Sequence, residues 1–259
     1  MYSCNYVINI ISKSEQMQEE LKKVPAVERF QYTFVVDSTP QNDSVKDADL
    51  IIWDTEKAPE EIQSTLSFIN ANKKQDASII LSLTSFVANS LQEEVYKGVD
   101  QVWIKPYSDE RLRFLFERRM MQEKEKKDSW LTNNYLDTLI DSVPDMIWFK
   151  DKVGAHLKVN DAFCGVVDKT KQQIQGRGHY YIWNIELEEY SKGEYICVES
   201  EAEVMNAKKT CVFEEKVKVK KEMRTLTTYK SPLFDLDGSV MGTVGWAHDI
   251  TDEKKREDA

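Results

Sequence analysis

The sequence predicts a doubly wound α/β domain with a five-stranded parallel sheet, followed by a long helix and an α+β domain with an antiparallel sheet. Three observations support this fold class. Short apolar segments alternate with amphipathic segments through residue 107, which is typical of parallel sheets covered on both faces. No glycine or proline interrupts residues 111–143. After Pro144, alternating strand patterns joined by short turns predominate.

The first domain is expected to comprise residues 1–107, and each apolar strand is followed by a segment with helical spacing. Met17, Leu21 and Val24 illustrate this spacing after the first strand. Such units build a parallel sheet of flavodoxin-like strand order. The predicted strands are residues 6–11, 32–36, 50–53, 78–83 and 101–104.

The second domain is expected over residues 144–252. Gly154 marks a turn between two short strands, and Asp237-Gly238 predicts a hairpin. The predicted strands are residues 145–150, 156–159, 210–219, 225–234 and 240–248. A helical region is predicted from residue 186 to 208, between the second and the third of these strands.

Composition excludes several classes of function. A net charge of −10 over 259 residues disfavours binding to nucleic acid or anionic membranes. The four cysteines form no CxxC pair, so neither zinc nor disulfides are expected. No apolar run is long enough for a membrane span and no signal peptide is evident, so we expect a cytoplasmic protein.

Three residues at the ends of predicted strands carry a family resemblance. Asp54 ends the third strand, Thr84 ends the fourth, and Lys105 precedes Pro106 after the fifth. Residues 4–120 resemble a receiver domain of two-component signalling. The resemblance implies that Asp54 is the phosphoacceptor position, that Thr84 and Lys105 contact the phosphoryl group, and that the Lys105–Pro106 peptide is cis.

The sequence departs from the receiver pattern where the acidic pair that holds Mg²⁺ should follow the first strand. Ser12 and Lys13 stand there instead, and Mg²⁺ requires oxygen ligands that bring negative charge. We therefore expect a pseudo-receiver that works by protein contact, in which Lys105 or Lys13 neutralises Asp54. A phosphorylatable Asp54 is the alternative.

The connecting helix is expected over residues 108–143, with Ser108 as its N-cap. Apolar residues at roughly heptad spacing favour a parallel homodimeric coiled coil. A solvated helical linker is the alternative. The charged stretch at 123–128 weakens the apolar stripe and leaves a bend or break of the helix near 126–134 open. The apolar positions are Leu112, Leu115, Phe116, Met120, Leu131, Leu136, Leu139, Ile140 and Val143.

The second domain resembles a PAS domain over residues 134–252. The resemblance rests on Asn160-Asp-Ala-Phe163 and on the exit sequence that ends Asp249-Ile250-Thr251. It implies a sensory fold that binds a small molecule or nothing between sheet and helices, and an output linker beginning at 253–259.

No cofactor is expected in this domain, because the flavin and haem motifs of the family are missing, although an unknown small-molecule ligand remains open. His156 is expected on an exposed strand and His179 in a loop. Four aromatic side chains are candidates for lining a ligand cavity, with ordinary core packing as the alternative: Trp148, Trp183, Phe213 and Trp246.

The sequence thus predicts a non-catalytic regulatory module, because no nucleophile–base pair, phosphate loop or metal cluster stands out. The resemblance implies a fused C-terminal effector, for which a GGDEF-type diguanylate cyclase is favoured. The sensor region of a histidine kinase is the first alternative, and a phosphorylatable response regulator is the second.

Overall fold

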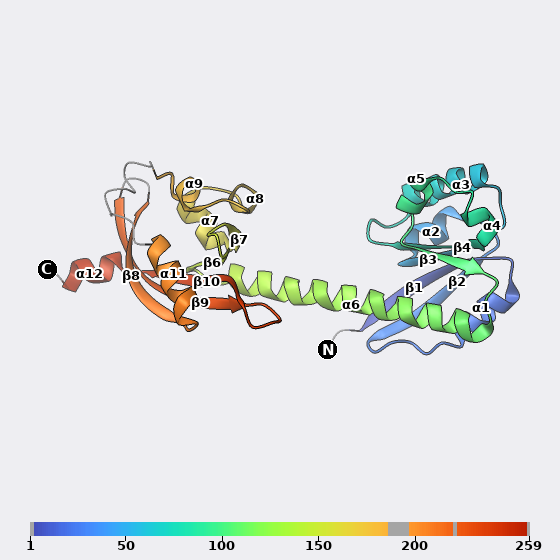
Figure 1. Cartoon of the computed structure of the whole chain (residues 1–259), viewed down its shortest axis with the longest axis horizontal. Coiled ribbons are helices and arrows are strands. Elements are labelled where there is room, and N and C mark those ends of the chain that lie inside the picture. The colour runs from blue at the N-terminus through green and yellow to red at the C-terminus, as the bar shows by residue number, and fades with distance from the viewer. Residues whose placement is uncertain (1–2, 186–196, 220–221, 258–259) are drawn as a thin grey trace. The chain divides into compact units, whose positions relative to one another are not determined.

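The structure is a computed structural model that describes residues 3–185, 197–219 and 222–257 (Figure 1). The chain divides into two compact units, Met1–Trp130 and Leu131–Ala259. Each unit is described by itself. None of the helices in the described ranges combines the length and the apolar character that a membrane span requires.

The first unit contains a five-stranded parallel sheet in the order β2-β1-β3-β4-β5, which confirms the predicted fold class. The strands are β1 (Cys4–Ile11), β2 (Phe30–Asp37), β3 (Leu50–Asp54), β4 (Ser78–Thr84) and β5 (Gln101–Lys105). The helices are α1 (Glu15–Lys22), α2 (Asn42–Asp47), α3 (Pro59–Asn72), α4 (Ser85–Ala88), α5 (Glu93–Lys97) and the start of α6 (Asp109–Asp141).

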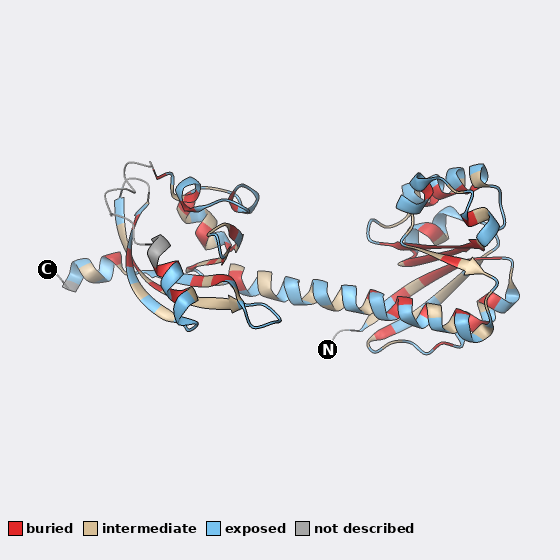
Figure 2. Ribbon diagram, in the orientation of Figure 1, coloured by how far each residue is buried: buried red, intermediate tan, exposed pale blue. Residues whose placement is uncertain are grey.

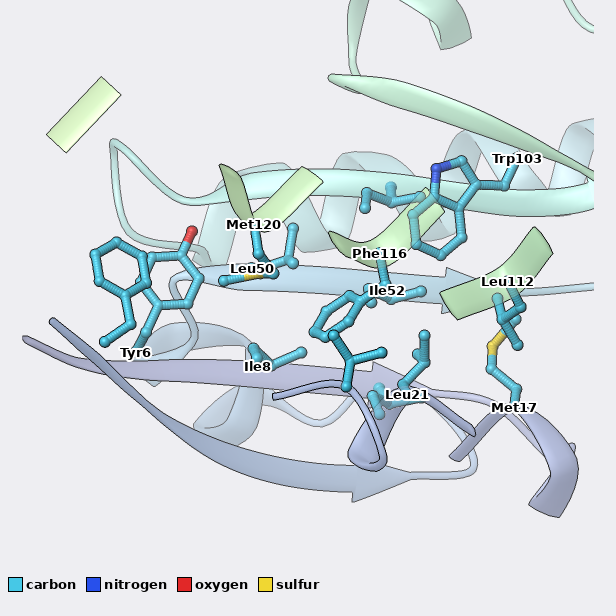
Figure 3. Packing of buried hydrophobic residues seen from close by; sticks show 14 residues of the cluster. Tyr6, Ile8, Met17, Leu21, Leu50, Ile52, Trp103, Leu112, Phe116 and Met120 are labelled. Carbon is cyan, nitrogen blue, oxygen red and sulfur yellow. The ribbon is translucent and has the colours of Figure 1, made fainter. Parts of the chain in front are cut away.

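Alternation along the strands gives this sheet two apolar faces, and buried residues fill both (Figure 2). Ile8 and Ile52 face one side, where they pack with α1 and α6 (Figure 3). Ile51 and Leu81 face the other side, where α3 covers them. A strand whose successive side chains enter two different cores reads as a continuous apolar run, which is why the sequence predicted these strands well.

The beginning of α6 belongs to the core of the first unit. Leu112, Phe116 and Met120 are buried against the sheet, and burying each large apolar side chain stabilises the fold by about 2 kcal/mol. The same segment carries the buried ion pair Arg119–Glu123, and Glu123 accepts a 2.7 Å hydrogen bond from the Ser78 hydroxyl.

This packing corrects the expected coiled-coil stripe. Leu112, Phe116 and Met120 are covered by their own sheet and cannot line a seam with a second chain. Helical spacing alone does not distinguish a residue that packs on its own domain from one that packs on a partner. The exposed apolar residues of α6 lie elsewhere on it, at Phe114, Met121, Trp130, Tyr135 and Leu139.

The second unit contains a five-stranded antiparallel sheet in the order β7-β6-β10-β9-β8, as predicted. The strands are β6 (Met146–Asp151), β7 (His156–Val159), β8 (Cys211–Val219), β9 (Glu222–Phe234) and β10 (Val240–Asp249). The helices are the end of α6, α7 (Asp161–Val167), α8 (Lys171–Ile174), α9 (His179–Trp183), α11 (Cys197–Ala207) and α12 (Thr251–Glu257).

The missing side chain of Gly245 shapes the centre of the second sheet. Gly245 pairs with Trp148 across β6 and β10, and a Cβ atom on Gly245 would lie 2.5 Å from the indole ring. Only glycine therefore lets the Trp148 ring lie across β10. The indole is held inside the unit, next to Phe163 at a centroid distance of 5.9 Å.

Asn160 joins the end of α6 to the second sheet. Its amide nitrogen donates to the carbonyl oxygens of Ile140, Val143 and Asp145 at 2.8–3.2 Å. Its side-chain oxygen accepts from the backbone N–H groups of Ile147 and Phe163. Asn160 is completely buried, so these five bonds replace water for both halves of its amide.

We predict that Asn160→Asp destabilises the second unit by about 3 kcal/mol, because a carboxylate would face three carbonyl oxygens without a donor. Hydrogen exchange of the β6 amides in the full chain measures the effect. Asn206→Asp, on the exposed side of α11, is the matched control and should leave protection within a few tenths of a kcal/mol. Equal protection in both variants would refute the bridging role.

Candidate functional sites

The first candidate site surrounds Asp54 at the carboxyl end of β3. The Asp54 carboxylate accepts hydrogen bonds from Ser12 at 2.8 Å and from Ser82 at 2.9 Å. Lys105 forms an ion pair with the same carboxylate at 2.9 Å. Asp54 and Lys105 thus meet as the family resemblance implies, and the Lys105–Pro106 peptide is cis.

Two of the predicted residues do not contact Asp54 among the described interactions. Lys13 is exposed and lines the cavity of about 640 Å³ beside Asp54 without pairing with it. The Thr84 hydroxyl caps α4 by accepting from the Val87 N–H.

Ser82, which the sequence reading missed, supplies the hydroxyl that Thr84 was expected to provide. It lies inside the apolar β4 strand, where no local pattern distinguishes it from a core serine. Its one proton goes to Asp54, so the Tyr107 hydroxyl, 2.5 Å away, donates to Ser82. Burial, together with the Asp54 charge, raises the pKa of Tyr107 to about 12, which keeps that proton in place.

These residues do not fit the Mg²⁺ that receiver domains hold. The ion needs several oxygen ligands, mostly with negative charge, whereas both Asp54 oxygens are engaged by Ser12, Ser82 and Lys105. Within the described residues, no group of three or more acidic, histidine or cysteine side chains is arranged to hold a metal. Lys105 supplies the positive charge at Asp54.

The second candidate site lies inside the second unit, where four charged side chains are buried. Lys230 donates to the Ser200 hydroxyl at 2.6 Å and to Glu215 at 2.8 Å. Lys150 donates to Glu201 at 3.0 Å. Burial acts to raise the pKa of Glu201, but the ammonium groups of Lys150 and Lys230 lower it to about 2. We call these four side chains, Lys150, Lys230, Glu201 and Glu215, the ionic cluster.

Aromatic rings lie next to the ionic cluster. The Phe163 ring lies 5.9 Å from Trp183 and 5.5 Å from His156, centroid to centroid. His179 lies 6.2 Å from Trp183. Aromatic side chains and three members of the ionic cluster line a cavity of about 20 Å³, which we call the core cavity. It is lined by Trp148, Lys150, His156, Phe163, His179, Trp183, Glu215, Val217, Leu226 and Lys230.

The four predicted cavity aromatics are only partly brought together. Trp148 and Trp183 line the core cavity. Phe213 lies on the inner face, 5.7 Å from the Lys230 ammonium group. Trp246 lies outside: it is 41% exposed and stacks on Tyr229 on the other face of the sheet.

His156 lies on a strand as expected, but its side chain is buried rather than exposed. His179 was expected in a loop, whereas it begins helix α9, and its side chain is buried as well. Burial, reinforced by Lys150, lowers the pKa of His156 to about 4. The same two causes, with His156 and Lys230 added, lower the pKa of His179 to about 3. Strand and loop propensities carry no information on burial, so only tertiary contacts reveal these residues.

The exit residues anchor the start of α12. The Thr251 hydroxyl accepts a 2.9 Å hydrogen bond from the Thr225 N–H of β9 and donates to Asp249. The second oxygen of Asp249 lies 3.5 Å from Arg224. These contacts therefore fix the start of α12 to the sheet.

Comparison with protein families matches residues 140–255 to a model described as the PAS fold. Similar solved structures include the PAS domain of Bordetella pertussis BvgS, at 21% identity and a TM-score of 0.34, covering 49% of this chain and 93% of that chain. A PAS domain from Colwellia psychrerythraea matches at 15% identity and a TM-score of 0.38, covering 47% and 98%. Curated protein sequences gave no match.

Residues 140–255 thus form a PAS domain, a non-catalytic sensory domain. The structural similarities concern the fold alone. A Vibrio cholerae VqmA–ligand–DNA complex also matches, at 16% identity and a TM-score of 0.37, covering 44% of this chain and 50% of that chain. The expectation that this chain binds no nucleic acid rests on its charge and stays a prediction.

We predict that the PAS domain loses stability as the pH falls from about 6.5 to 5. His156 and His179 stay neutral in the folded domain, whereas the unfolded chain binds their protons below its ordinary pKa of 6.5. The unfolded state therefore binds more protons, which lowers the free energy of unfolding by about 3 kcal/mol over this range. Hydrogen exchange of the slowest amides of β6, β9 and β10 measures it.

His179→Gln is the control for this pH dependence, because it removes one of the two buried imidazoles. Its stability should decline roughly half as steeply over the same range. A wild-type profile that is flat between pH 6.5 and 5 would contradict the assignment of neutral, buried histidines.

Proposed function

We propose that the chain is the regulatory segment of a signalling protein, in which the PAS domain detects a signal and the adjoining helices carry it to an effector. The observation that carries this proposal is a contact between the entry and the exit of the domain. His248 near the end of β10 lies 2.7 Å from Asp145, the residue that leads from α6 into β6. A shift of the sheet therefore acts on both connections.

The hydrogen bonds at the two connections support this relay. Asn160 holds the end of α6 to β6 and α7, and Thr251 holds the start of α12 to β9. Rigid attachment matters because a helix transmits a rotation only when its end follows the domain that moves it.

We further propose that the effector follows α12 and is a GGDEF-type diguanylate cyclase. The support is the resemblance of the Asp249-Ile250-Thr251 exit to the linkers that enter such domains, together with the familiar order of receiver, PAS and GGDEF domains. The sensor region of a histidine kinase is the second candidate, since the same exit also leads into dimerisation helices.

The first unit is proposed to act as a pseudo-receiver that works by contact. Its strand order 2-1-3-4-5 and its Asp54–Lys105 pair support the receiver resemblance. Because Lys105 and two hydroxyls already satisfy Asp54, the site resembles a neutralised phosphoacceptor. Phosphoryl transfer depends on metal ions that offset developing charge, and the donor set here does not fit one.

Homodimerisation through α6 is part of the proposal. Phe114, Met121 and Tyr135 are exposed on α6 and are separated by one and two heptads. Such spacing places side chains on one side of a helix in a coiled coil. The partner implied is a second copy of the chain.

We predict that acetyl phosphate with Mg²⁺ leaves Asp54 unmodified, as measured by intact mass. Ser12→Asp/Lys13→Asp, which places two carboxylates at the end of β1, is the matched variant and should gain Mg²⁺-dependent phosphorylation. Stoichiometric phosphorylation of the wild-type chain at Asp54 would make it a conventional receiver.

We predict that helix insertions change the output of a fusion between residues 1–257 and a reporter diguanylate cyclase domain. One to four alanines inserted after Lys126 should alter cyclase activity several-fold, with recovery near a full turn of 3.6 residues. Met121→Glu should shift the same fusion towards monomer in sedimentation velocity.

The control for the helix insertions places the same alanines in the β9–β10 turn at Leu236, which is fully exposed. Those insertions should leave cyclase activity unchanged. Cyclase activity that does not depend on the number of alanines inserted in α6 would contradict the proposed relay.

A further inference from the structure

Strand β2 forms an edge of the first sheet (Figure 1). At the two ends of its ladder with β1, N–H groups from the β1 side donate to the carbonyl oxygens of Arg29 and Asp37. Alternate residues of a strand bond to one neighbour in a parallel ladder, so the odd-numbered residues of β2 bond to β1. The even-numbered residues direct their N–H and C=O groups to the outside of the sheet, as the bond from the Phe30 N–H to the Val27 carbonyl shows.

The outward residues that follow Phe30 are available to a further strand. Over the described parts of the chain, the backbone groups that Tyr32, Phe34 and Val36 direct outward form no hydrogen bond. The rings of Tyr32 and Phe34 pack on Phe116 at centroid distances of 5.9 and 6.2 Å. The strand is therefore held in place by its own core, and pairing with another strand orders little further chain.

The other sheet edges carry the usual protection against pairing, which consists of charges, prolines, bulges or short length. Strands β5 and β7 have five and four residues, and β8 carries the exposed charges of Glu214, Lys216 and Lys218. Strand β2 has eight residues and an unbroken register with β1, and residues 30–36 contain neither a charge nor a proline. Of these four edges, β2 is therefore the least protected.

The outward groups of β2 are complementary to those of a second copy of the same strand. When two copies run antiparallel with Phe34 at a two-fold axis, Phe34 pairs with Phe34 of the second copy. Tyr32 then pairs with Val36 of the second copy, and the reverse pair forms by symmetry. In an antiparallel ladder such pairs exchange both N–H···O bonds, so every outward backbone group of these three residues finds a partner.

The side chains and the symmetry of this register are compatible with pairing as well. Thr33 faces Val35 across the contact and Gln31 faces Asp37, so no like charges oppose each other. The contact is isologous, and one partner uses up the β2 edge of each copy. The pairing therefore closes at two copies and does not continue as a stack of strands.

We propose that β2 is a self-association surface, through which two copies of the chain join their parallel sheets into one continuous sheet about a two-fold axis at Phe34. The contact is separate from the pairing proposed for α6, because α6 covers a face of this sheet and not its β2 edge. Two paired strands bury little area, so the contact is weak, with a dissociation constant of about 100 µM. It forms where the chain is concentrated, and it joins α6 dimers into larger assemblies.

Solvent exchange of single amides, measured by NMR on the full wild-type chain, tests the proposal without a variant. The odd-numbered amides of β2 should be protected at every concentration, because they bond to β1. Between about 20 and 500 µM chain, exchange at Tyr32, Phe34 and Val36 should slow roughly threefold as the copies pair. Exchange at these three amides that does not depend on concentration, or that slows equally at the odd-numbered amides, would overturn the proposal.

Charge variants test the contact by sedimentation equilibrium of the full chain carrying Met121→Glu, which removes the α6 contact. Thr33→Lys/Val35→Lys places lysines directly opposite each other only in the paired state, so the dissociation constant should rise at least about tenfold. Gln63→Lys/Ser67→Lys adds the same charge to exposed positions of α3. This matched control should associate like the Met121→Glu chain, and equal association of the two double variants would place the contact elsewhere.

A backbone variant in the same background tests the hydrogen bonds themselves. Val36→Pro removes an outward N–H and leaves the ladder with β1 intact, since proline is tolerated where the N–H of an edge strand faces solvent. It should weaken pairing to a similar extent. Association of the Met121→Glu chain that continues past two copies, or no association up to about 500 µM, would overturn the two-fold contact. Because α6 pairing is absent in this background, the result decides the edge contact alone, and the helix insertions test the relay separately.

Discussion

The PAS domain depends on balancing charges that its fold keeps away from water. Two lysines and two glutamates meet inside it, and the hydroxyl groups of Ser200 and Thr243 form further hydrogen bonds with them. Removing any one of the four would strand an opposite charge, which typically costs 3–5 kcal/mol. Strands β6, β8 and β9 and helix α11 each contribute one member of the cluster. Burial, reinforced by the charge of Lys150, lowers the pKa of both His156 and His179.

A similar balance operates in the first unit with a different effect. There a lysine neutralises Asp54 where receiver domains use a metal ion, and two serines occupy the remaining hydrogen-bonding capacity of the carboxylate. In both units, therefore, lysine side chains form ion pairs with buried or half-buried carboxylates. Each of these carboxylates is held by ion pairs within its own unit.

Sequence reasoning predicted the strands of both sheets because apolar periodicity follows directly from which faces are covered. It found Asp54 and Lys105 because they stand at strand ends. It missed the ionic cluster. Lys150 lies on the same face of its strand as Trp148 and Met146, and Lys230 lies on the same face as Leu226. Charged residues on the apolar faces of several strands were the signal that could have indicated this cluster. Burial of His179 and the outward side of Trp246 depend on tertiary packing, which no local pattern reports.

The first three turns of helix α6 belong to the core of the first unit, because Leu112, Phe116 and Met120 complete the apolar layer over β1 and β3. Its last turn is tied by Asn160 to the PAS sheet. A protein shortened to end at Tyr107 would leave that layer uncovered and prone to aggregate. Within α6, a junction with another module is therefore compatible with both cores only in the middle turns, which restricts where new sensors can be joined to this helix.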